Sequence, residues 1–144
     1  MKALIKFSRL SWGSRAMLAE TALAVLGARV ALLVVPIRKI LRWSTVERFP
    51  SHAISSPMLE AELSRFVRAA GRRIPGATCL TQALALRYLL QKRGIRSELE
   101  IGVGKDANGF KAHAWLAVEG RVIHGGGRQL EDYERLSLRK GASL

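Results

Sequence analysis

The sequence is poor in the residues that bind metals and form disulfides. It contains one cysteine, Cys79, and three histidines among 144 residues. A single cysteine cannot form an internal disulfide, so nothing in the sequence calls for an oxidising compartment. No CxxC or HExxH spacing is present, and we therefore expect neither a bound metal nor a cofactor. The cytoplasm, where thiols stay reduced, is the predicted location.

Acidic residues are also scarce. The sequence has 11 Asp and Glu and 24 Lys and Arg, which gives a formal net charge of +13. More than half of this excess falls within residues 1–50. Such a charge attracts nucleic acid, a lipid surface or an acidic peptide. Trp12, Trp43 and Trp115 are too scattered to form stacking platforms for bases, so we expect no nucleic-acid partner. A basic nucleic-acid or membrane-surface binder is kept as an alternative.

No long uncharged hydrophobic run is present either. The apolar stretch 17–35 is interrupted by Glu20 and Arg29 and is followed by Pro36. Each uncharged piece is shorter than the roughly 20 residues that a membrane-spanning helix requires. We expect two helical pieces that pack on the rest of the chain or make peripheral membrane contact through residues 17–43. The cleavage pattern of a signal peptide is absent, so secretion is not expected.

What the sequence does contain is two helical patterns followed by an alternating one. Ser56 and Pro57 begin the first helix, which runs to about residue 73, and Thr78 is a natural cap for a second helix that starts at Cys79 and stops at Gly94. The period then changes to two, which predicts strands over 95–104, 110–118 and 121–124. Residues 129–136 suggest one or two helical turns. The fold class is therefore α+β, with a basic helical segment over 1–50 and a second domain over 51–144.

The cysteine and one histidine occupy positions where they could act together. A thiol at a helix N-terminus is favoured as the reactive thiolate, and the N–H groups of Cys79 and Leu80 could bind an oxyanion. Alternation along the second strand puts His113 and Trp115 on the face opposite the apolar face formed by Phe110, Ala112, Ala114, Leu116 and Val118. If the helix packs on the face of His113, the two residues form a nucleophile and a base. The spacing alone also fits a cysteine that is only a small buried hydrophobe.

The stretches RIPGATCLTQALALRYLLQKRGI and IGVGKDANGFKAHAWLAVEGRVI, with ALLVVPIRKILRW ahead of them, resemble the stand-alone leader peptidase of lasso-peptide biosynthesis. The resemblance implies a papain- or transglutaminase-like fold, with the catalytic cysteine at the start of a helix packed on an antiparallel sheet. It implies that Cys79 is the nucleophile, that His113 is the base and that Trp115 shapes the pocket beside them. The implied partners are the precursor peptide, a leader-binding protein that presents it, and the lasso cyclase.

The resemblance fails at the third catalytic position. Many relatives carry an acid about a dozen residues after the histidine, and here that count reaches Gly125, which has no side chain. Glu119, His124 and Asp132 are candidate replacements, and a water or a backbone carbonyl could also orient the imidazole. The missing acid supports an alternative function, that of a catalytically inactive transglutaminase-like adaptor.

Two strand registers are compatible with the sequence around these candidates. A three-residue turn with a bulge at Gly120 would bring position 125 opposite His113 and turn His124 away. A two-residue turn at 119–120 would instead put His124 on the face of His113. We favour the first register.

Overall fold

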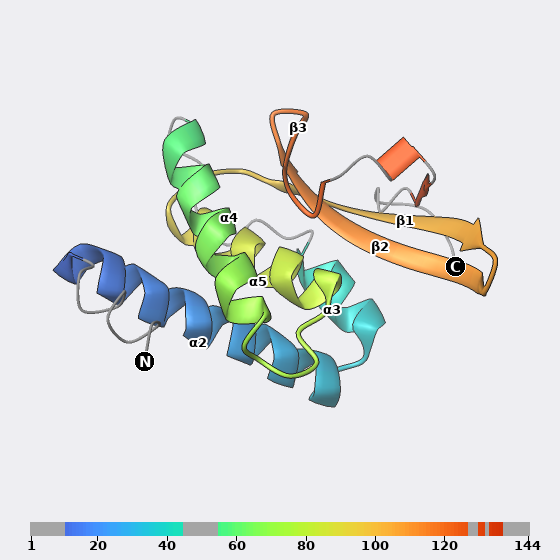
Figure 1. Cartoon of the computed structure of the whole chain (residues 1–144), viewed down its shortest axis with the longest axis horizontal. Helices are drawn as coiled ribbons and strands as arrows, with labels where there is room; N and C mark the ends of the chain where they lie inside the picture. The colour runs from blue at the N-terminus through green and yellow to red at the C-terminus, as the bar shows by residue number, and fades with distance from the viewer. Residues whose placement is uncertain (1–10, 45–54, 127–129, 132, 137–144) are drawn as a thin grey trace.

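The computed structural model describes residues 11–44, 55–126, 130–131 and 133–136. In chain order, its helices and strands are α2 (Trp12–Val34), α3 (Ile37–Ser44), α4 (Pro57–Gly71), α5 (Cys79–Lys92), β1 (Glu98–Asp106), β2 (Gly109–Val118), β3 (Arg121–His124) and β4 (Glu134–Leu136) (Figure 1). The α+β class is confirmed, and the N-terminal segment does contain two helices separated at Pro36.

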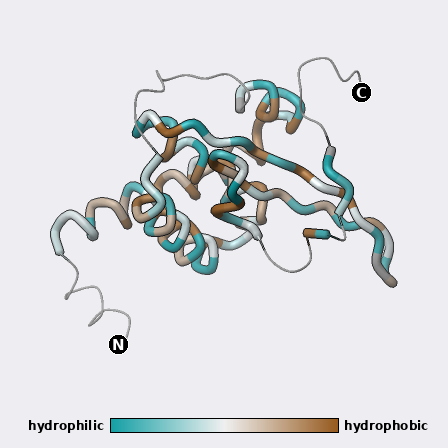
Figure 2. Tube along the Cα trace, turned by 90° about the horizontal axis from the view of Figure 1, so that it is seen from above, coloured by the Kyte–Doolittle hydropathy of each residue, from teal (hydrophilic) through white to brown (hydrophobic). Residues whose placement is uncertain are grey.

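The four strands form one antiparallel sheet in the order β3-β2-β1-β4. Helix α5 packs against β2 and β1, and α4 packs against α5 and β3. Helix α2 contacts α4 and α5 and forms an outer layer on their side away from the sheet (Figure 1). Figure 2 shows that hydrophilic and hydrophobic residues are interspersed along the chain.

The core lies between α5 and the sheet and extends to α2. It contains Val25 of α2, Leu63 and Val67 of α4, the buried side of α5, and Ala114, Leu116 and Val118 of β2. The expected apolar face of β2 is therefore correct only in its second half. Phe110 is 83% exposed, because β2 extends beyond the helices that cover the sheet.

Local sequence signals account for the helix boundaries. Helix α5 begins at a capping box, in which the Thr78 and Thr81 side chains each accept a hydrogen bond from the other residue's backbone N–H. It ends before Gly94, whose φ of +76° is the left-handed conformation that glycine adopts without strain. Ser56 is the N-cap of α4 and Pro57 is its first residue, but the Ser56 side chain makes no capping hydrogen bond, contrary to expectation.

Helix α2 is longer than the sequence suggested. It continues through Glu20 and Arg29 without a break, and by length and composition it could cross a membrane. The helix as a whole thus reaches a length that neither of its uncharged pieces reaches, because Glu20 and Arg29 do not end it. The proposed division at residue 50 stays a prediction.

Candidate active site

Cys79 is the first residue of α5, half-buried and packed against the core. The capping box uses the N–H groups of Thr78 and Thr81, and the N–H of Gln82 donates to the Thr78 carbonyl. Within residues 55–126, no hydrogen bond is made by the N–H groups of Cys79 and Leu80. The first turn of the helix therefore presents a thiol and two free amide donors together, which is the arrangement that an oxyanion requires.

His113 lies in the middle of β2, on the strand against which α5 packs. Its Nε2 lies 2.6 Å from the carbonyl oxygen of Gly125. A carbonyl only accepts, so Nε2 carries the proton, and Nδ1 of the neutral ring then holds a lone pair. Among the described residues, Cys79 and His113 are not hydrogen-bonded to each other. Helix α5 packs on the face of β2 that carries Ala114, Leu116 and Val118, and His113 alternates with these residues, so the packing of α5 on the face of His113 that we considered is not observed.

Two aromatic rings lie beside the imidazole. The Trp115 ring stacks on it at a centroid distance of 6.1 Å, and Tyr133 lies 5.5 Å away in a tilted arrangement. Trp115 is fully buried and donates from Nε1 to Glu100 at 2.8 Å. Arg135 pairs with the same carboxylate at 3.3 Å and lies over the indole ring.

Gly102 makes this packing possible. It is the residue of β1 directly opposite His113, and a Cβ atom there would lie 2.8 Å from the Trp115 ring and 2.8 Å from the Cβ of Tyr133. A contact below 3 Å forces neighbouring groups to move. Gly102 therefore leaves the space in which the indole and the tyrosine meet beside the imidazole.

Glu100, Gly102, Tyr133 and Arg135 were not among the residues expected from sequence. Alternation along β1 places Glu100 and Gly102 on one face, which was a usable signal for this pair. Tyr133 and Arg135 belong to the segment expected to be helical, and Arg135 instead lies in strand β4, which pairs with β1.

The register between β2 and β3 differs from the one we favoured. Glu119 and Gly120 both have positive φ, 50° and 77°, and form a two-residue turn. The pairing of Ala117 with Val122 is followed by that of Leu116 with His124, so a bulge at Ile123 shifts the register. The expected bulge at Gly120 is wrong. Because of the bulge at Ile123, His124 nevertheless lies on the face of Leu116 and not on that of His113.

The candidates for the third position can now be placed. Glu119 is exposed in the turn, roughly 20 Å along the strand from His113. His124 is buried and bonded through Nδ1 to Ser64 Oγ at 2.8 Å, and Ser64 donates to the Ile123 carbonyl. Asp132 lies outside the described residues. The group that holds His113 is the backbone carbonyl of Gly125.

Burial sets the charge state of His124. Loss of water contact lowers its pKa to about 4, and the electrostatic effects of Arg68 and His113 act in the same direction. His124 is therefore neutral at physiological pH and serves to attach the end of β3 to α4.

No group of three His, Cys, Asp or Glu side chains able to hold a metal ion is present among the residues that the structure describes. The chemistry available at the site is that of a thiol, an imidazole and two backbone donors.

The arrangement defines a class: a helix-terminal cysteine and a strand histidine on an α+β fold. Residues 22–138 match the model of the transglutaminase-like superfamily, and the chain belongs to this superfamily, which often contains cysteine peptidases. No curated protein and no solved structure matches the chain.

Proposed function

We propose that this protein is a cysteine peptidase that removes the leader from a ribosomally made lasso-peptide precursor. The observation that carries the peptidase activity is the His113–Gly125 hydrogen bond, because it leaves Nδ1 of an oriented imidazole free to act as a base. The specific substrate rests on the resemblance of the CLTQAL and AHAW motifs to lasso leader peptidases.

The proposed reaction requires the Cys79 thiol to reach His113, whose Nδ1 then takes the thiol proton. The thiolate attacks the carbonyl carbon at the junction of leader and core, and the N–H groups of Cys79 and Leu80 bind the oxyanion. The imidazolium protonates the leaving amine of the core, which departs and leaves the leader as a thioester. Water, deprotonated by His113, then hydrolyses the thioester, which releases the leader carboxylate and restores the thiol.

The inactive adaptor is less well supported than the enzyme. Its support was the missing side chain at position 125, and the carbonyl of that residue now makes the contact that an acid would make. A cytoplasmic location, a leader-binding partner and a lasso cyclase belong to the same proposal as the peptidase activity.

The test is incubation of the chain with a lasso-peptide precursor and a leader-binding protein, with cleavage followed by mass spectrometry. The unmodified chain should cut at one junction, and Cys79→Ala and His113→Ala should not. Phe110→Ala, at an exposed position of the same strand, is the matched control and should cut normally. Cleavage by Cys79→Ala would disprove the mechanism.

Thiol reactivity tests the catalytic pair without a substrate. Alkylation of Cys79 by iodoacetamide at pH 7 should be on the order of tenfold faster in the unmodified chain than in His113→Ala, because the proposed mechanism requires the imidazole to deprotonate the thiol. An inert Cys79 in the unmodified chain would favour the adaptor.

A further inference from the structure

The outer side of α2 carries no charge. Every exposed residue of this helix is apolar or glycine, and together they form what we term the outer stripe: Trp12, Gly13, Ala16, Ala19, Leu23, Leu26, Gly27, Val30, Leu33 and Val34. Leu23, Leu33 and Val34 are each at least 65% exposed. The stripe runs the whole length of the helix, which is more apolar surface than a solvated helix normally leaves open.

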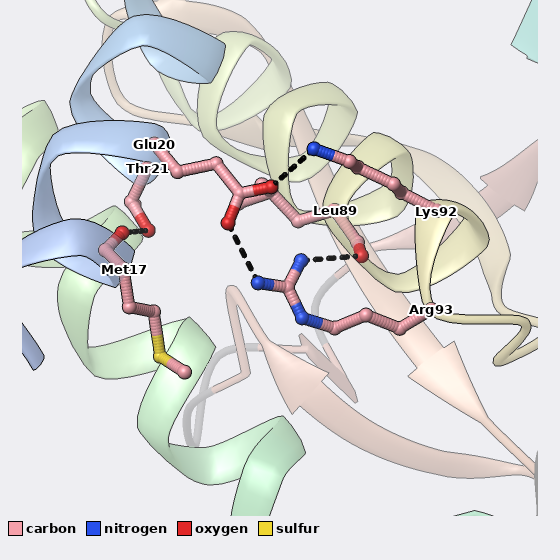
Figure 3. Close-up of polar contacts among 6 residues, drawn as sticks. All are labelled: Met17, Glu20, Thr21, Leu89, Lys92 and Arg93. Atoms are coloured by element: carbon pink, nitrogen blue, oxygen red, sulfur yellow. Dashed lines mark hydrogen bonds and ion pairs between the residues drawn. The ribbon is translucent and has the colours of Figure 1, made fainter. Parts of the chain in front are cut away.

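The inner side of the same helix is bound to the domain. Glu20 pairs with Lys92 at 2.9 Å and with Arg93 at 2.7 Å, and Arg93 also donates to the Leu89 carbonyl (Figure 3). Thr21 and Val25 lie on this inner side of α2 and are fully buried. Crossing a bilayer would break these contacts and bring Glu20 into hydrocarbon, so α2 can meet a membrane only along its outer stripe.

Cations and tryptophans border the stripe. Helix α3 follows directly and presents Arg38, Lys39 and Arg42 at exposed positions, with no acid in its sequence. Trp43 is 50% exposed and lines a cavity of about 550 Å³ together with Leu23 and Gly27, while Trp12 is 85% exposed at the other end of α2. Tryptophan and basic residues beside an apolar helix face are typical of proteins that lie in a membrane interface.

We propose that the outer stripe and α3 dock on an anionic lipid bilayer, with α2 lying parallel to the membrane plane. The positive charge of α3 favours an anionic membrane over a second copy of the chain as the partner of this surface. A second copy docked on the same face would bring the α3 cations of both copies together. The sheet lies on the opposite side of α4 and α5 from α2, so the docked domain keeps the sheet in water (Figure 1).

The test is co-sedimentation of the purified full chain with vesicles of phosphatidylcholine alone or with phosphatidylglycerol. Binding is expected to the anionic vesicles and to weaken with added salt. Leu33→Glu should lower partitioning on the order of tenfold, because it removes an inserted side chain and adds a carboxylate. Phe110→Glu makes the same kind of change on the β1–β2 hairpin, at an exposed apolar residue outside the stripe, and should bind like the unmodified chain.

Two measurements complete the test. Light scattering gives the oligomeric state, and a dimer that Leu33→Glu converts to a monomer, without vesicle binding by either, would assign the stripe to a second copy and overturn the proposal. Vesicle-bound protein that resists alkaline carbonate would show a spanning helix and also overturn it. The outcome is independent of the peptidase proposal, because Cys79 alkylation in solution should be the same in Leu33→Glu and in the unmodified chain.

Discussion

The imidazole of His113 is held by a main-chain atom, the carbonyl oxygen of Gly125, 2.6 Å from Nε2. The contact joins the middle of β2 to the residue just after β3, and it depends on the bulge that separates the two registers of this strand pair. Its geometry is therefore set by the path of the chain around position 125.

Gly125→Ala should lower the melting temperature and slow the reaction. Gly125 has a φ of +76°, and a Cβ atom there would lie 2.7 Å from the Ala114 carbonyl oxygen. Strain at positive φ costs about 1–2 kcal/mol, and the close contact adds to it. Thermal denaturation measures the loss. Gly120→Ala is the matched control, because Gly120 has a φ of +77° but a Cβ atom there would have no neighbour within 4 Å. The additional loss of stability caused by a close contact should therefore appear only in Gly125→Ala. Equal effects of the two would contradict this geometry.

Gly102→Ala should disturb the imidazole from the other strand. The added methyl group meets Trp115 and Tyr133 at 2.8 Å, and overpacking of this kind costs about 2 kcal/mol. Near-ultraviolet circular dichroism should report a changed Trp115 environment, and Cys79 alkylation should slow. An unchanged spectrum with an unchanged alkylation rate would show that the packing around His113 tolerates the methyl group.

Stability should fall between pH 7 and pH 5 because of His124. Its pKa is about 4 in the folded chain and about 6.5 as the ordinary value, so the unfolded chain binds the extra proton in this interval and acid favours unfolding. The expected loss in the free energy of unfolding is about 2 kcal/mol. Urea denaturation at the two pH values measures it. His124→Asn keeps an N–H donor for Ser64 but cannot titrate, and most of the pH dependence should vanish in it. The pKa of Glu20 is lowered by Arg93 and Lys92, so its contribution is lost only in more acidic solution.

The two sides of α2 should respond differently to truncation. Val25→Ala removes buried methyl groups from the core and should cost about 2 kcal/mol, whereas Leu33→Ala on the outer stripe should change the stability of the chain in solution by less than about 0.5 kcal/mol. Urea denaturation of both variants decides the matter. Similar values would mean that α2 is not packed on α4 and α5 as described.

The parts of the fold that depend on local chemistry could be predicted from sequence. The start of α5 was predictable because the Thr78 cap satisfies donors within one turn, and the strand β3 was predicted with its observed bounds. The breaks at Pro36 and Gly94 follow from the backbone preferences of those two residues.

The parts that depend on tertiary contacts were not predictable. The attachment of β3 to α4 depends on the Ser64–His124 hydrogen bond and on the ion pair between Arg121 and the buried Glu60, whose atoms are 3.1 Å apart. Glu60 and Ser64 lie on α4, some 60 positions away in the sequence from their partners, and no local pattern reveals these contacts. Strand β4 has only three residues, two of them charged, so the alternation typical of a strand could not be recognised in its sequence.

Under the proposed mechanism, the main-chain carbonyl that holds His113 has a consequence for mutagenesis. Substitution changes side chains, and no substitution deletes a main-chain oxygen. A screen that replaces each residue in turn would find Cys79 and His113 by loss of activity and would detect Gly125 only through misfolding. Deep mutational data on this protein would therefore report a catalytic dyad, and only an altered backbone, such as an ester bond in place of the amide that follows Gly125, would weaken that acceptor and reveal the third member.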